Sequence, residues 1–132
     1  MTRWYDERRM KVLGCEPNPG HAALAKLEEH LAETGRKLTI VTQNVDGLHA
    51  RAGSKNVIEV HGSLTTWRCI ETGKEYRDLP DAPFDDYPPK TASGSLLRPG
   101  VVWFGESLPA EAVRAASEAL RDCDVYIAIG TS

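Results

Sequence analysis

Residues 38–49 read Leu-Thr-Ile-Val-Thr-Gln-Asn-Val-Asp-Gly-Leu-His, an apolar run that passes directly into a polar one. The β-branched residues at its start, preceded by Gly35, are typical of a short buried strand. A second run, Val57-Ile58-Glu59-Val60, leads in the same way into His61-Gly62-Ser63. Two strands that both end in hydrogen-bonding groups indicate a functional site at their ends.

Three segments have the pattern of helices that pack one face against a core. They are residues 2–13, the segment between Asn18 and Gly35, and a segment that opens at Pro109. The second is the best defined, because Asn18 can cap it and Pro19 suits its first turn. The inner faces of the second and third segments would hold Leu24, Leu27, Leu31, Val113, Ala116 and Leu120.

The rest of the chain supplies further strands and one long loop. Residues 65–69 and 74–77 predict a hairpin, residues 101–104 a short strand, and the apolar run 124–129 a closing strand. Residues 78–95, rich in Pro, Asp, Gly and Ser, predict a loop. Alternating strands and helices favour the α/β class, with a parallel sheet flanked by helices.

In open parallel sheets ligands bind beyond the carboxyl ends of the strands. Gln43 and Asn44 follow one predicted strand, and Gly130, Thr131 and Ser132 follow another. Glycine lets a ligand approach the backbone closely, and the two hydroxyls can donate to ribose or phosphate oxygens. This arrangement indicates a nucleotide site, although Gly-Thr-Ser after a strand is also ordinary turn chemistry.

Composition excludes several classes of protein. The 132 residues are 41% hydrophobic, enough for one compact domain or two small lobes. A net charge of −3 argues against nucleic acid as a partner. No apolar run approaches the ~20 residues that span a bilayer, so we expect no membrane contact. The polar amino end and three scattered cysteines predict a cytoplasmic protein with reduced thiols.

Residues 42–49, followed by 60–62, closely resemble the sirtuins, the NAD-dependent protein deacylases. The likeness extends to residues 18–21, 102–106 and 129–132, in the order and spacing of that family. It implies a Rossmann-like part, formed by residues 1–64 and 96–132, and a small zinc-ribbon-like lobe formed by residues 65–95. It also implies NAD as cofactor, acylated-lysine proteins or peptides as substrates, and nicotinamide and O-acyl-ADP-ribose as products.

The resemblance also implies roles for single residues at the cofactor. His61 would be the general base that draws a proton from the ribose, which suits an imidazole whose ordinary pKa lies near neutrality. Gln43 and Asn44 would hold the ribose, and Asp46 would receive the nicotinamide carboxamide. Gly130, Thr131 and Ser132 would bind the ribose and phosphates. The alternatives are a core histidine at position 61 and an Asx-turn without a ligand at residues 43–46.

Two further segments would contact the substrate. Val102, Trp103, Phe104, Gly105 and Glu106 would pair with the peptide as an added strand, unless they form an ordinary edge strand. Tyr5 and Arg8 resemble the acyl-pocket pair of the sirtuins that remove succinyl and malonyl groups. A guanidinium binds a carboxylate through two hydrogen bonds, so the pair predicts a preference for acidic acyl groups. Their spacing alone fits a solvent-facing Arg equally well.

The chain also departs from the family. Sirtuins usually carry zinc on two cysteine pairs, but Cys69 is the only Cys or His in residues 65–95, so we expect no zinc. The family's opening strand with its glycine-rich loop, and its closing segments, are not in this sequence, which predicts a fragment of a longer protein. Two alternatives to a deacylase therefore stay open: a non-catalytic module that binds NAD or acyl-peptide, and a protein ADP-ribosyltransferase.

Overall fold

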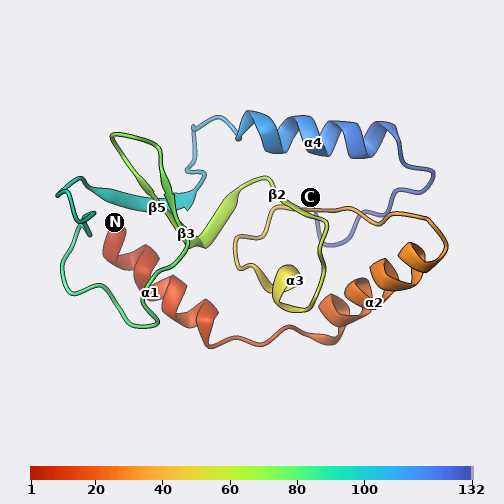
Figure 1. Cartoon of the computed structure of the whole chain (residues 1–132), viewed down its shortest axis with the longest axis horizontal. Coiled ribbons are helices and arrows are strands. Elements are labelled where there is room, and N and C mark those ends of the chain that lie inside the picture. The colour runs from red at the N-terminus through yellow and green to blue at the C-terminus, as the bar shows by residue number, and fades with distance from the viewer. Residues whose placement is uncertain (132) are drawn as a thin grey trace.

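A computed structural model describes residues 1–131 as four helices and five strands in the part of the chain it covers (Figure 1). The elements follow one another in this order: α1 (Thr2–Leu13), α2 (Pro19–Glu33), β1 (Ile40–Thr42), α3 (Leu48–Arg51), β2 (Val57–Glu59), β3 (Gly62–Cys69), β4 (Glu75–Tyr76), β5 (Leu97–Val101) and α4 (Ala110–Arg121). Ser132, one of the predicted cofactor-binding residues, lies outside the described residues.

The parallel part is the pair β1–β2. Ile40 lies beside Val57 and Thr42 beside Glu59, so both strands end at the same edge. Figure 1 shows α4 on one side of this pair and α2 with α3 on the other. This arrangement of helices about parallel strands is the predicted Rossmann-like α/β part. The α2 N-terminus is also as predicted, since the Asn18 side chain accepts from His21 N at 3.1 Å and Pro19 opens the helix.

The second part is an antiparallel sheet in the order β4–β3–β5. Trp67 lies opposite Tyr76, and Cys69 lies opposite Leu97, which confirms the predicted hairpin. Trp67, Cys69 and Leu97 are buried and form the hydrophobic cluster of this lobe. Phe84, from the loop after β4, packs edge-on against Trp67 with ring centroids 4.9 Å apart. The long loop is therefore part of the lobe's core.

Two predicted strands are wrong, wholly or in part. The strand expected at residues 101–104 lies earlier, at Leu97–Val101, because it is these residues that pair with the backbone of β3. Residues 125–129 form no strand. A strand of a parallel sheet needs cover on both faces, whereas the apolar side chains of this run, at Val125, Tyr126, Ile127 and Ile129, are between 66% and 75% exposed.

The predicted inner faces of two helices are also only partly buried. Leu27 of α2 is 39% exposed, and no residue of that helix is fully buried. On α4 the small Ala116 is buried, but Val113 and Leu120 are 41% and 51% exposed. The periodicity of apolar residues therefore predicted the positions of the helices correctly but overestimated how much of their apolar faces is buried. Among residues 1–131, no helix has both the length and the apolar character needed to cross a bilayer.

A buried ion pair joins α1 to the loop after β4. Asp6 and Arg9 are 0% and 1% exposed, and Arg9 Nε donates to Asp6 Oδ1 at 2.7 Å. The guanidinium also donates to the carbonyls of Pro80 and Ala82, at 2.5 and 2.8 Å. The other carboxylate oxygen accepts from the backbone N–H of Phe84 at 2.9 Å and from the hydroxyl of Tyr87. The first helix is thus fastened to the small lobe.

We expect Asp6→Asn to lower the free energy of unfolding by about 3–5 kcal/mol, because it leaves the Arg9 charge buried without its partner. Urea denaturation followed by circular dichroism measures the change. Glu7→Gln is the matched control: Glu7 pairs with Arg3 at 4.0 Å on the exposed side of α1, where a pair contributes at most about 1 kcal/mol. Equal losses in the two variants would contradict the anchoring role of the buried pair.

Candidate active site

The site is built where the parallel strands end. Gln43 follows β1 directly and His61 follows β2, so the common edge of the two strands brings them together. His61 Nδ1 lies 3.1 Å from the carbonyl oxygen of Gln43, and Gln43 Nε2 lies 3.4 Å from Thr131 Oγ1. Three of the predicted site residues, Gln43, His61 and Thr131, are therefore joined by hydrogen bonds although they are up to 88 positions apart in the sequence.

The contact of His61 with Gln43 determines which ring nitrogen is available. A carbonyl oxygen only accepts, so the hydrogen bond requires the proton of a neutral imidazole to be on Nδ1. Nε2 then keeps its lone pair. The ring is half-buried, neither enclosed in the core nor fully in solvent. These are the requirements for a general base that works through Nε2.

The backbone after His61 connects the two parts of the molecule. Gly62 has φ +77°, and a Cβ there would lie 2.0 Å from the carbonyl oxygen of Gly100 on β5. The carbonyl of His61 itself accepts from Val102 N at 2.9 Å. The glycine therefore permits the close antiparallel pairing of β3 with β5, and the backbone of His61 is hydrogen-bonded to the predicted substrate segment.

The loop between β1 and α3 is held by its own side chains. Asn44 N donates to Thr42 Oγ1 at 3.1 Å, and Leu48 N donates to Asp46 Oδ1 at 3.0 Å. The latter is the Asx-turn that was the alternative interpretation of residues 43–46. It occupies one oxygen of Asp46, and Asp46 is half-buried. The turn fixes the shape of this loop and is compatible with ligand binding by the other oxygen.

His49 follows this loop and packs against α2. Its ring meets that of His21 nearly edge-on, with centroids 4.7 Å apart. Burial, and then the proximity of His21, lower the pKa of His49. His21 Nδ1 accepts from the backbone N–H of Asn18 as part of the α2 cap. The pair therefore joins α3 to the start of α2.

The predicted substrate residues are drawn from opposite ends of the chain. The ring of Tyr5 on α1 lies nearly parallel to that of Trp103, with centroids 6.1 Å apart. Arg8, one turn further along α1, is exposed, and its guanidinium carbon lies 3.8 Å from the ring centroid of Trp4. Phe104 is fully exposed. The structure thus brings Tyr5 and Trp103 together and leaves Arg8 and Phe104 at the surface.

Residues 102–106 form a turn after β5. Val102 N donates to His61, Trp103 N donates to Glu106 Oε2 at 2.9 Å, and Glu106 N donates to Trp103 O at 3.0 Å. These three backbone donors are therefore engaged within the chain, and strand addition by a peptide stays a prediction for the rest of the turn. Arg98, which binds Glu106, was missed from the sequence, because no helix or strand spacing relates the two.

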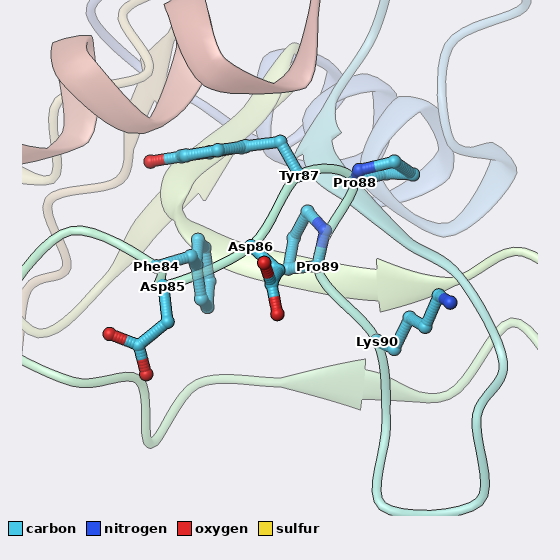
Figure 2. A pocket seen from close by; sticks show the side chains of 7 residues that line it. All are labelled: Phe84, Asp85, Asp86, Tyr87, Pro88, Pro89 and Lys90. Atoms are coloured by element: carbon cyan, nitrogen blue, oxygen red, sulfur yellow. The ribbon is translucent and has the colours of Figure 1, made fainter.

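A hollow of about 580 Å³ lies elsewhere, in the loop of the small lobe (Figure 2). It is lined by seven consecutive residues, from Phe84 to Lys90. Figure 2 shows Tyr87 running beneath α1, with Asp85 and Asp86 pointing away from that helix. None of the predicted site residues lines this hollow, so it carries none of the chemistry described above.

Parallel strands whose polar ends converge between flanking helices define a Rossmann-like α/β protein, a class in which ligands bind at the carboxyl ends of the strands. The comparison with known proteins makes this specific: the chain belongs to the Sir2 family, whose sequence model matches residues 1–132. The chain is 48% identical to an NAD-dependent protein deacylase of Aquifex aeolicus over 130 residues, which cover 98% of this chain and 52% of that protein. It is likewise 48% identical over 136 residues to NAD-dependent protein deacylase 1 of Pseudomonas aeruginosa, with coverage of 98% and 53%.

Solved structures agree with this assignment. A mutant Sir2 homologue in complex with ADP-ribose superposes with a TM-score of 0.80 at 42% identity, over 92% of this chain and 47% of its own. A Sir2 homologue–NAD complex gives 0.76 at 46% identity, over 87% and 43%. A Sir2–p53 peptide–NAD⁺ structure gives 0.59 at 39% identity, over 80% and 44%. The chain spans about half the length of the curated relatives it matches.

Cys69 is the one cysteine or histidine of the small lobe, residues 65–95, that could bind a metal. Hydrogen bonds from the side chain and then the backbone of Thr72 lower the pKa of its thiol, and its side chain is buried. Over residues 1–131 no group of three or more Cys, His, Asp or Glu side chains is placed to share a metal ion. The absence of zinc stays a prediction.

We expect elemental analysis of the purified full-length protein to find no stoichiometric zinc. Its thermal unfolding midpoint should then be the same with and without EDTA. A structural zinc contributes directly to folding, so removing one would lower the midpoint. One equivalent of zinc per chain, or a fall in the midpoint with the chelator, would contradict the prediction.

Proposed function

We propose that the protein is an NAD-dependent protein-lysine deacylase. The observation that supports this proposal is the chain of contacts from His61 through Gln43 to Thr131, in which the proposed general base lies beside polar groups of the kind that a dinucleotide needs. The Gln43 amide and the Thr131 hydroxyl supply donors and acceptors of the kind that ribose and phosphate oxygens need. The residues present therefore fit NAD.

Bound NAD would supply an activated ribose, which loses nicotinamide and takes the acyl group of a lysine side chain, so that the free lysine amine is released. His61 would take a hydroxyl proton from this ribose on Nε2, while the Gln43 carbonyl holds the proton on Nδ1. The developing imidazolium is stabilised because Nδ1–H keeps its acceptor throughout. Asp46, whose second oxygen stays available, would bind the nicotinamide carboxamide, and Asn44 the ribose.

We further propose that acidic acyl groups are preferred, on the basis of Tyr5 and Arg8. The Arg8 guanidinium rests on the face of Trp4, and stacking of this kind uses the plane of the group and leaves its N–H edge free. That edge can donate two hydrogen bonds to a terminal carboxylate, as succinyl and malonyl groups have and acetyl groups lack. The Tyr5 hydroxyl would add one donor.

The function is tested by incubating the full-length protein with NAD and a succinyl-lysine peptide and analysing the products by mass spectrometry. Free lysine and O-succinyl-ADP-ribose are expected. His61→Asn should lower kcat by about 10²–10⁴-fold, the range of general-base catalysis, with NAD affinity retained. His30→Asn is the control, since His30 is exposed on α2 beside Glu33. Binding without products would indicate a non-catalytic module, and ADP-ribose attached to protein would indicate ADP-ribosyl transfer.

Arg8→Met tests the acyl preference. We expect kcat/KM for a succinyl-peptide to fall by about ten- to a hundredfold, the loss of a charge-assisted pair of hydrogen bonds. Activity on the matching acetyl-peptide should be little changed, because it has no carboxylate for Arg8 to bind. Arg3→Met, at an exposed position on the same helix, is the control. Equal losses on the two peptides would refute the assignment of Arg8.

A further inference from the structure

Arg98 on β5 forms an ion pair with Glu106 at the end of the turn that follows this strand. Arg98 Nη1 lies 2.6 Å from Glu106 Oε1, and Nη2 lies 3.0 Å from Oε2. The two side chains are 17% and 35% exposed. The pair is therefore better shielded from water than the ion pairs on the surfaces of α1, α2 and α4. Two parallel hydrogen bonds of this kind fix geometry as well as charge.

The pair holds Trp103 from two directions. Glu106 Oε2 accepts from the backbone N–H of Trp103 at 2.9 Å. The guanidinium carbon of Arg98 lies 3.7 Å from the centroid of the Trp103 ring, close enough for a cation–π contact. The main chain and the indole of one residue are thus held by the two members of one ion pair.

Trp103 stands between the two halves of the site. Its neighbour Val102 donates to the carbonyl of His61 at 2.9 Å, and its own ring lies parallel to that of Tyr5. A shift of the turn would therefore move the indole relative to both the general base and the acyl-pocket tyrosine. A displaced indole would no longer stack on Tyr5, so we expect a shift of the turn to weaken the binding of a ligand held against these two rings.

The Arg98 guanidinium, and then the Trp103 N–H, lower the pKa of Glu106 to about 2. Because the pKa is depressed on folding, the contribution of the pair to stability is complete above the ordinary value of 4.5 and is lost as the pH falls through 2. The carboxylate is charged at every pH at which the enzyme would work. The pair is therefore a constant restraint and not a pH switch.

We propose that Arg98 and Glu106 are positioning residues for the acylated peptide, which fix Trp103 against Tyr5 as one wall of the acyl-lysine pocket. This inference rests on the proposed deacylase function and adds to it. It gives Glu106 a task different from the one predicted from the sequence, since its carboxylate binds the chain itself and does not face the peptide.

The test compares Glu106→Gln and Arg98→Lys with the wild type in the full-length protein. Glu106→Gln should raise KM for the acyl-peptide by about tenfold or more, with kcat and NAD affinity little changed. Arg98→Lys keeps the charge but loses the planar fork, so its KM should lie between those of Glu106→Gln and the wild type. Glu111→Gln removes a comparable 2.8 Å pair with Arg114 on exposed α4 and should behave as wild type.

An unchanged KM would overturn the inference, whether or not kcat falls. A lower kcat at unchanged KM would mean that the pair affects only the fraction of enzyme that is folded. If the wild type itself releases no lysine, the proposed function fails, and the positioning is judged by ¹⁹F NMR of protein labelled with 5-fluorotryptophan. Trp103→Phe assigns the resonance of Trp103. A shift of that resonance in Glu106→Gln supports the positioning, and an unmoved resonance overturns it.

Discussion

The parallel register of β1 and β2 is the constraint on which the site depends. Thr42 is paired with Glu59, so the next residues of both strands leave the sheet at one edge. A slip by one residue would turn every following side chain to the opposite face. It would separate the Gln43 carbonyl from the ring of His61 and change the nitrogen that carries the proton. For the proposed general base, the ring nitrogen left free to take a proton is thus a consequence of strand pairing.

The small lobe shows a different principle. Its sheet is short and its connecting loop is long, and a buried charge pair on α1 supplies acceptors and donors to that loop. Removing two charges from water is costly, and the cost is offset only when the remaining hydrogen-bonding capacity is filled. Asp6 and Arg9 meet this condition through Pro80, Ala82 and Phe84. The first helix therefore belongs structurally to the lobe and presents Tyr5 from it.

Sequence patterns predicted what local chemistry determines. The cap at Asn18, the end of α1 near Gly14 and the hairpin of β3 and β4 follow from short-range preferences and were predicted correctly. The strand at residues 125–129 was not, because an apolar run becomes a strand only when a neighbour pairs with it. The role of Arg98 was not predicted either, because its ion pair with Glu106 depends on the shape of a turn, and no sequence periodicity predicts that shape.

The close approach of Gly62 to Gly100 has a consequence for the variation that this protein can accept. A methyl group on the first would lie 2.0 Å from the backbone of the second, and one on the second would lie 2.7 Å from the backbone of Thr66. Neither obstacle is a side chain that could swing aside. Substitution of either glycine would therefore force the backbone of the paired strands to shift, and with it the alignment between the proposed base and the segment proposed to bind the peptide.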